Sequence, residues 1–276
     1  MTDQRVRLDL AYDGTDFHGW AVQPGLRTVQ GVLEEALARV TRITVPVAVA
    51  GRTDTGVHAR GQVAQVDLPA EVWAGLPGRS GRSPEHALAS RLNGVLPPDC
   101  RVLAVSPAVP GFDVRFSALW RRYCYRIADR RGAFDPLTRR FTWWAPSMLN
   151  AGAMAEAAAP LLGEHDFLPF CRPREGASTV RTLQELSLQR PAPGRIELWV
   201  QADAFCHHMV RALVGALVAV GAGRRPVTWP GQVLAAGVND PAVTVLPAVG
   251  LTLEQVAYPP DGELAAQAAK ARTFRG

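Results

Sequence analysis

Two spacings of apolar residues recur along this chain and predict its strands and helices. Alternating apolar and polar positions, as in residues 5–12, are typical of a half-buried strand. Apolar residues spaced three and four apart are typical of amphipathic helices. The predicted strands are residues 5–12, 45–50, 62–68, 101–106, 121–128, 183–189 and 195–203. The predicted helices are residues 29–40, residues 85–96, an alanine-rich stretch that Ser147 caps and that ends near Leu162, and residues 209–222.

The order of these elements predicts an α+β fold. Strands come in hairpin-like pairs with helices between the pairs, which indicates antiparallel sheets with helices on one side. The proline-bounded segment 107–111 is the expected linker. We therefore expect two similarly built lobes, residues 1–106 and 107–276, with an active-site cleft between them.

Composition narrows the class of protein. The 276 residues are 47% hydrophobic, which excludes a disordered chain. The formal net charge of +5 favours an anionic partner such as nucleic acid, although many enzymes with neutral ligands share it. The chain starts with polar residues, and its most apolar run is too short to span a bilayer. A cytoplasmic protein that does not enter a membrane is expected.

The four cysteines predict no metal or redox motif, because none of them forms a C-x-x-C pair. Cys124 and Cys206 lie in apolar or strand-like runs, and we expect both to be buried packing residues.

A glycine-bounded loop holds the most informative chemistry. In it Asp54 follows Arg52 by two residues and precedes His58 by four, with Gly51 and Gly56 on either side. A nearby cation favours the charged form of a carboxylate, which can then act as nucleophile, base or cation ligand. The structural alternative is an aspartate that caps a turn or makes an ion pair. The flanking residues favour a functional role for Asp54, but the loop alone does not indicate which reaction it serves.

The predicted strand 121–128 carries two tyrosines on one face, Tyr123 and Tyr125, and two arginines on the other. An aromatic ring with cations nearby suits base stacking and phosphate contact. The alternative is that both tyrosines fill the core.

The segment that opens the last predicted helix contains His207, His208 and, one turn later, Arg211. Adjacent histidines on a helix point about 100° apart, so they are not expected to bind one metal ion from that helix. An arginine at the start of an apolar helix is expected to be paired, and Arg211 could hold a carboxylate such as Asp54.

Together these segments resemble the tRNA pseudouridine synthase A family over about residues 7–258. One departure is Thr55, where many members carry alanine. The matching segments are Tyr12-Asp13-Gly14 with Gly19-Trp20, Gly51-Arg52-Thr53-Asp54-Thr55-Gly56-Val57-His58-Ala59, Phe116-Ser117-Ala118, Arg121-Arg122-Tyr123-Cys124-Tyr125, Asp166-Phe167, Ser178-Thr179-Val180-Arg181-Thr182 and Phe205-Cys206-His207-His208-Met209-Val210-Arg211.

The resemblance implies an isomerase that converts uridine to pseudouridine at positions 38 to 40 of the tRNA anticodon stem-loop. It implies that Asp54 is the nucleophile, that Tyr123 stacks on the flipped uracil, and that Arg52 and Arg211 place the aspartate and the nucleotide. We group His58 with these substrate-binding residues. It also implies a homodimer that binds tRNA and needs neither cofactor nor metal.

Two other functions stay open from the residues alone. One is a non-catalytic tRNA-binding or tRNA-folding module, which the basic balance and the aromatic strand suggest. The other is a hydrolase that uses Asp54 with His58 or His207. Neither explains all the segments jointly.

Overall fold

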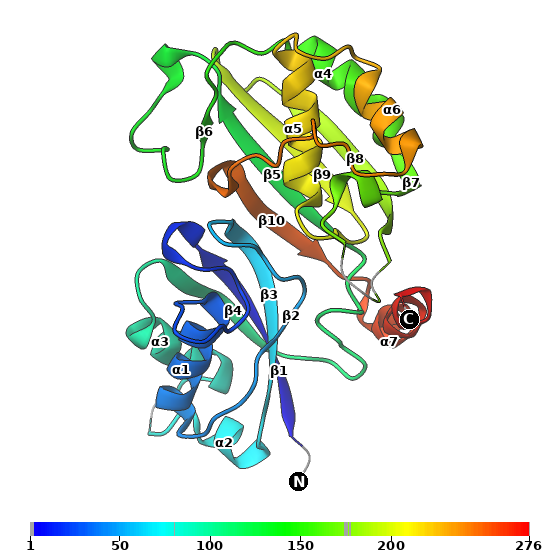
Figure 1. The fold of residues 1–276 in the computed structure, drawn as a ribbon. Helices are drawn as coiled ribbons and strands as arrows, with labels where there is room; N and C mark the ends of the chain where they lie inside the picture. Colours follow the sequence, from blue (N-terminus) through cyan, green and yellow to red (C-terminus); the bar gives the residue numbers. More distant parts are fainter. Residues whose placement is uncertain (1–2, 80, 174–175, 177, 276) are drawn as a thin grey trace. The chain divides into compact units, whose positions relative to one another are not determined.

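The chain folds as two units, and its last helix belongs to the first of them (Figure 1). The computed structural model describes residues 3–79, 81–173, 176 and 178–275. Within these, unit 1 comprises the chain up to Leu119 together with residues 255–274, and unit 2 comprises residues 120–254. The segment expected as a linker, residues 107–111, lies within unit 1. It leads directly into the buried Phe112, whose ring lies 5.1 Å from that of Tyr258.

Unit 1 is built on an antiparallel sheet in which β1 (Gln4–Tyr12) lies between β3 (His58–Leu68) and β4 (Cys100–Pro107). The short β2 (Ala48–Val49) pairs with β3. Alternate residues of β1 are buried, as its sequence pattern predicts. The helices of this unit are α1 (Val29–Thr41), α2 (Ala70–Gly75), α3 (Pro84–Val95) and α7 (Leu264–Arg275).

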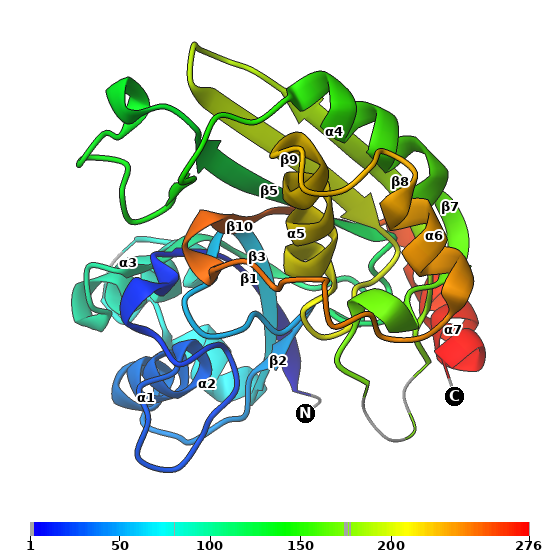
Figure 2. The same ribbon diagram turned by 45° about the horizontal axis from the view of Figure 1, so that its top comes forward.

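Unit 2 contains the antiparallel strand order β5 (Trp120–Ala128), β9 (Arg195–Ala202), β8 (Val180–Gln189), β7 (Gly163–Asp166). The short β6 (Trp143–Trp144) runs parallel to β5. Figures 1 and 2 show its helices on one face of this sheet. They are α4 (Ala151–Ala158), α5 (Met209–Gly221) and α6 (Trp229–Ala236).

Strand β10 (Leu251–Ala257) carries the chain from unit 2 back to unit 1. Short 3-10 turns complete the described elements: η1 (Gly14–Asp16), η2 (Arg131–Ala133), η3 (Ala159–Leu161), η4 (Leu168–Phe170), η5 (Ala248–Gly250) and η6 (Asp261–Glu263). None of the helices in the described part of the chain is both long and apolar enough to cross a bilayer.

The α+β class is confirmed, and each predicted strand and helix has a counterpart. The strand expected at 45–50 shortens to Ala48–Val49. Just before it, the Val47 N–H donates to the Glu34 carboxylate at 2.9 Å and not to a neighbouring strand. Helix α4 is capped by Asn150, whose side chain accepts from the Ala153 N–H at 3.1 Å, and not by the exposed Ser147.

Cys206 corrects a second expectation. It is not a simple packing residue, because a disulfide joins it to Cys171, with the two Cα atoms 5.8 Å apart. The two cysteines are 35 residues apart in sequence, so no local sequence motif predicted this disulfide. Cys124 is buried, as expected.

Candidate active site

Asp54 begins a tight turn at the edge of the unit 1 sheet, in the loop that joins β2 to β3. The Val57 N–H donates to the Asp54 carbonyl at 3.1 Å, and Gly56, the third residue of the turn, has a φ of 77°. A positive φ at that position is what a type II turn requires, and glycine adopts it without steric cost. The Asp54 side chain is half-buried, while the neighbouring Thr55 is exposed.

A second loop packs against the backbone of this turn. The Trp20 N–H donates to the Thr53 carbonyl at 3.0 Å, and the Gly56 N–H donates to the Phe17 carbonyl at 3.2 Å. At Gly19 a Cβ atom would lie 3.0 Å from the Thr53 carbonyl oxygen, and the φ of Gly19 is 87°. The Gly19-Trp20 pair therefore supports the Asp54 turn through close backbone approach.

Arg52 and His58 flank Asp54 in sequence but differ in environment. The Arg52 side chain is exposed, and among the described residues it makes no hydrogen bond or ion pair. The His58 side chain is only 6% exposed, and its Nδ1 accepts the Gly14 N–H at 3.0 Å. His58 therefore links the start of β3 to the loop after β1, and its role in substrate binding stays a prediction.

Tyr123 lies on β5 of unit 2, opposite Val200 of β9. Its side chain is buried, and its ring meets that of Phe205 edge-on at 5.2 Å between centroids. Aromatic pairs prefer this edge-to-face arrangement. The contact with Phe205 therefore favours the observed orientation of the ring that is expected to stack on a base.

The two faces of β5 separate as the alternation predicts, with Tyr123 and Tyr125 buried on one of them. On the other, Arg122 pairs with Glu185 at 2.9 Å, and Arg126 pairs with Glu254 at 2.7 Å. These two arginines are therefore engaged in ion pairs within unit 2, which makes them poor candidates for the phosphate contacts that cations next to Tyr123 suggested.

Arg211 lies in the first turn of α5 and is half-buried. Its Nε donates to the Leu246 carbonyl, and the Leu246 N–H donates in return to the Arg211 carbonyl at 3.3 Å. The residue before the helix, His208, has a φ of 69°, a conformation that costs free energy in any residue with a side chain. Such outliers cluster at functional sites.

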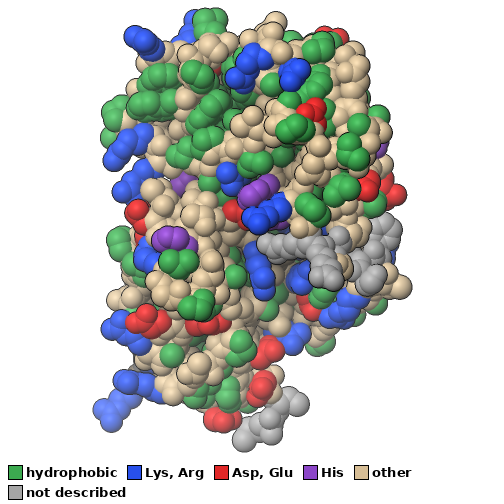
Figure 3. All heavy atoms as spheres, viewed as in Figure 1, with side chains coloured by type: hydrophobic (Ala, Val, Ile, Leu, Met, Phe, Trp, Pro, Cys, Tyr) green, Lys and Arg blue, Asp and Glu red, His purple; other side chains and the backbone are tan. Residues whose placement is uncertain are grey.

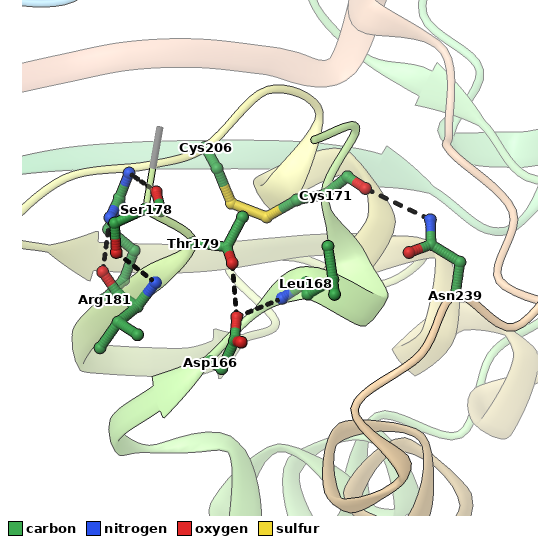
Figure 4. Close-up of a disulfide and its surroundings, with 9 residues drawn as sticks. Asp166, Leu168, Cys171, Ser178, Thr179, Arg181, Cys206 and Asn239 are labelled. Carbon is green, nitrogen blue, oxygen red and sulfur yellow. Dashed lines mark hydrogen bonds between the residues drawn. A yellow bond between two sulfur atoms is a disulfide. The ribbon is translucent and has the colours of Figure 1, made fainter. Parts of the chain in front are cut away.

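The disulfide lies next to this turn (Figure 4). Cys206 precedes His207, whose carbonyl accepts the Arg172 N–H at 2.9 Å, and Arg172 follows Cys171. Near the pair, the Asp166 carboxylate accepts the Leu168 N–H at 3.0 Å and the Thr179 hydroxyl at 2.5 Å. The Asp166-Phe167 and Ser178–Thr182 segments are thus hydrogen-bonded to each other close to residues 205–211.

The expected site residues fall into two sets. Asp54, Arg52 and His58 belong to unit 1, and Tyr123 and Arg211 belong to unit 2. On the face drawn in Figure 3, basic side chains are spread among acidic and hydrophobic ones. The chain has a single lysine, Lys270, so its basic side chains are nearly all arginine.

Sequence reasoning gave no role to two residues that support these sets, Gln62 of unit 1 and Phe205 of unit 2. Gln62 is fully buried and continues the inward-facing row Leu68, Val66 and Ala64 of β3. A polar residue at a core position of an alternating strand was the available signal, because a buried amide needs hydrogen-bond partners.

Comparison with known proteins adds an independent finding. A family model described as tRNA pseudouridine synthase matches residues 10–117 and 157–259. A tRNA pseudouridine synthase A from Streptomyces griseus is 58% identical, covering 100% of this chain and 97% of the relative. One from Frankia casuarinae is also 58% identical, with the same coverage. One from Mycobacterium leprae is 48% identical over 99% of this chain and 96% of its own length.

Proposed function

Because the chain belongs to the tRNA pseudouridine synthase family, we propose that its targets are uridines at positions 38 to 40 of the anticodon stem-loop and that Asp54 is the nucleophile. The family isomerises uridine to pseudouridine in tRNA, and the protein is accordingly an isomerase. One observation supports the assignment of Asp54 as nucleophile. Its half-buried carboxylate lies in a turn that needs Gly56 and that hydrogen bonds from a second loop hold in place.

The reaction first requires the target nucleotide to leave the helix. A uridine inside a stem cannot expose its glycosidic bond, so it is flipped out at a cost of a few kcal/mol. Stacking of the uracil on Tyr123 and contacts from Arg52 and Arg211 to the RNA backbone offset that cost. The exposed guanidinium of Arg52 and the fixed ring of Tyr123 support these roles.

The chemical steps then follow from the substrate. The bond between N1 of uracil and C1′ of ribose breaks, the base turns, and C5 bonds to C1′. The ionised carboxylate of Asp54 attacks either C1′ of the ribose, which displaces the uracil, or C6 of the uracil. In the first case the bond from Asp54 to C1′ breaks as C5 bonds to C1′, and in the second the bond from Asp54 to C6 breaks after C5 has bonded to C1′. A base finally removes the proton from C5, and N1, which has lost its bond to C1′, takes up a proton. Isomerisation conserves every atom and leaves the oxidation state unchanged, so the reaction draws on no redox partner.

The test compares wild type with Asp54→Asn on unmodified tRNA transcripts that each carry one uridine, at position 38, 39 or 40. Wild type should form pseudouridine in at least one of them, and Asp54→Asn should form none while still binding tRNA, because phosphate contacts dominate affinity. Asp67→Asn is the matched control, since it makes the same chemical change in an exposed ion pair with Arg5. Full activity of Asp54→Asn would remove Asp54 from the mechanism.

A homodimer and a cytoplasmic location complete the proposal. Both rest on family resemblance, and the location also fits a tRNA substrate. Sedimentation of the purified protein with and without tRNA measures the first. The alternative of a non-catalytic tRNA-binding module requires Asp54→Asn to leave every measurable function intact.

A further inference from the structure

A buried polar cluster lies directly beneath the Asp54 turn in unit 1. It consists of the Tyr12 hydroxyl, the Gln62 amide, the Thr53 hydroxyl and the Gly51 carbonyl, which β1, β3 and the loop contribute. Gln62 is fully buried, and Tyr12 and Thr53 are 4% and 6% exposed. Buried polar groups in an apolar core are held only where their hydrogen bonds are made.

The hydrogen bonds of this cluster have one consistent direction. Gln62 Nε2 donates to the Gly51 carbonyl at 2.9 Å and to the Tyr12 hydroxyl at 3.2 Å, which uses both amide hydrogens. Because Tyr12 accepts from Gln62, its own proton is available to Thr53 Oγ1, 2.8 Å away. A tyrosine hydroxyl is protonated at neutral pH, and burial raises the pKa of the Tyr12 hydroxyl further.

The cluster reaches two points of the chain just before Asp54. Gly51 is held through its carbonyl, and Thr53 is held through its side chain. The Thr53 carbonyl is occupied from the other side by the Trp20 N–H, and the Val57 N–H closes the turn after Asp54. The chain just before Asp54 is therefore anchored to the core of the unit, and the turn closes on itself after Asp54.

We propose that Tyr12 and Gln62 are positioning residues that hold the Asp54 carboxylate in its reactive orientation through Gly51 and Thr53. The hydrogen bonds of these two residues end at Gly51 and Thr53, so their effect on Asp54 passes through the chain just before it. The proposal rests on the proposed role of Asp54 as nucleophile. Its physical basis is that a misplacement of about 1 Å at a reacting group can lower a rate by about 100-fold.

The test is Tyr12→Phe, which removes one hydroxyl and keeps the ring that packs on Phe17 and Trp20. Its kcat should fall by about 10- to 100-fold while the KM for tRNA changes less than about twofold. The matched control is Tyr258→Phe, which deletes another unit 1 hydroxyl, one that donates to the Val114 carbonyl at 2.7 Å. It should lose similar thermal stability and keep its kcat.

A second pair of variants keeps the proposal testable if Tyr12→Phe folds poorly. Thr53→Val removes the hydroxyl that Tyr12 meets and should lower kcat as Tyr12→Phe does, whereas Thr53→Ser should restore it. An unchanged kcat in a folded Tyr12→Phe or Thr53→Val variant overturns the proposal. If Asp54→Asn is inactive and Tyr12→Phe is normal, only the positioning role fails. If Asp54→Asn is active, the nucleophile assignment fails first.

Discussion

At the scale of single residues, the Asp54 turn depends on two glycines, Gly56 and Gly19, which have no side chain. Gly56 has a φ of 77° and Gly19 a φ of 87°, and the backbone of residues 53–55 lies against Gly19. A side chain at either position would strain the turn or displace it. The chemistry of Asp54 is thus tied to the glycines as closely as to its own carboxylate.

Gly19→Ala should lower both stability and turnover. A left-handed conformation costs a residue with a side chain about 1–2 kcal/mol, and the added Cβ would press on the Thr53 carbonyl from 3.0 Å. Gly25→Ala is the control, because Gly25 also has a positive φ, 72°, with nothing within 4 Å of the new Cβ. Urea unfolding should show a lower free energy of unfolding for both variants. Pseudouridine assays should show a lower turnover only for Gly19→Ala. Equal turnover in the two would contradict this account.

Tyr123→Leu should impair turnover more than binding. Leucine keeps much of the apolar volume but removes the ring, and base stacking contributes about 1–3 kcal/mol per base. We expect kcat/KM to fall by about 5- to 150-fold while the Kd for tRNA stays within about twofold. Single-turnover kinetics and filter binding measure the two quantities. A Tyr123→Leu variant with normal turnover would exclude Tyr123 from substrate stacking.

At the scale of elements, individual capping hydrogen bonds decide where helices begin. Thr28 caps α1 as its sequence predicts, accepting the Gly31 N–H at 3.3 Å. Helix α4 begins three residues later than predicted because Asn150, not Ser147, supplies the capping oxygen. Asparagine and serine are both good capping residues, so residue type alone does not decide which of Asn150 and Ser147 caps α4. The backbone conformation of the folded chain decides it.

Asn150→Ala should therefore destabilise the protein by about 1 kcal/mol, the usual loss when a capping side chain is removed. Ser147→Ala should have almost no effect, because Ser147 is exposed and caps no helix in the described chain. Thermal and urea unfolding of the two variants side by side would measure the difference. A larger loss for Ser147→Ala would show that the helix begins earlier in solution.

At the scale of the whole molecule, stability should depend on pH through buried carboxylates. Asp129, at the end of β5, is the clearest case. Its side chain is 0% exposed and pairs with Arg190 at 2.7 Å, and it also accepts the Leu149 N–H at 3.1 Å. Burial disfavours its charge, but Arg190 and the Leu149 N–H outweigh burial and leave the pKa of Asp129 below its ordinary value.

A lowered folded-state pKa stabilises the native protein above the unfolded-state pKa, and that stabilisation is lost as pH falls through the folded value. Asp129→Asn should thus be less stable than wild type at pH 7, and the gap should narrow below about pH 4. Urea unfolding across this range tests it. Asp67→Asn, in an exposed pair, should change little at any pH. A constant gap for Asp129→Asn would show that its charge is not the cause.

The sequence by itself determined the parts that depend on neighbours along the chain. Periodicity located strands β1, β3, β4, β5, β8 and β9 and helices α1, α3 and α5, but not strands β6, β7 and β10. The motif around Asp54 indicated the family that the comparisons confirm. These features are local, because a strand or helix face repeats every two or 3.6 residues. The positive φ in the turn Asp54–Val57 is likewise provided by a residue within the turn, Gly56.

Only the tertiary structure decided which distant groups meet. The cluster of Tyr12, Thr53 and Gln62 joins residues up to 50 positions apart, and the disulfide joins cysteines 35 apart. Residues 255–274 return to unit 1 after the whole of unit 2. Such contacts form because buried donors and acceptors must find partners wherever the packed chain supplies them, and no local pattern records that choice.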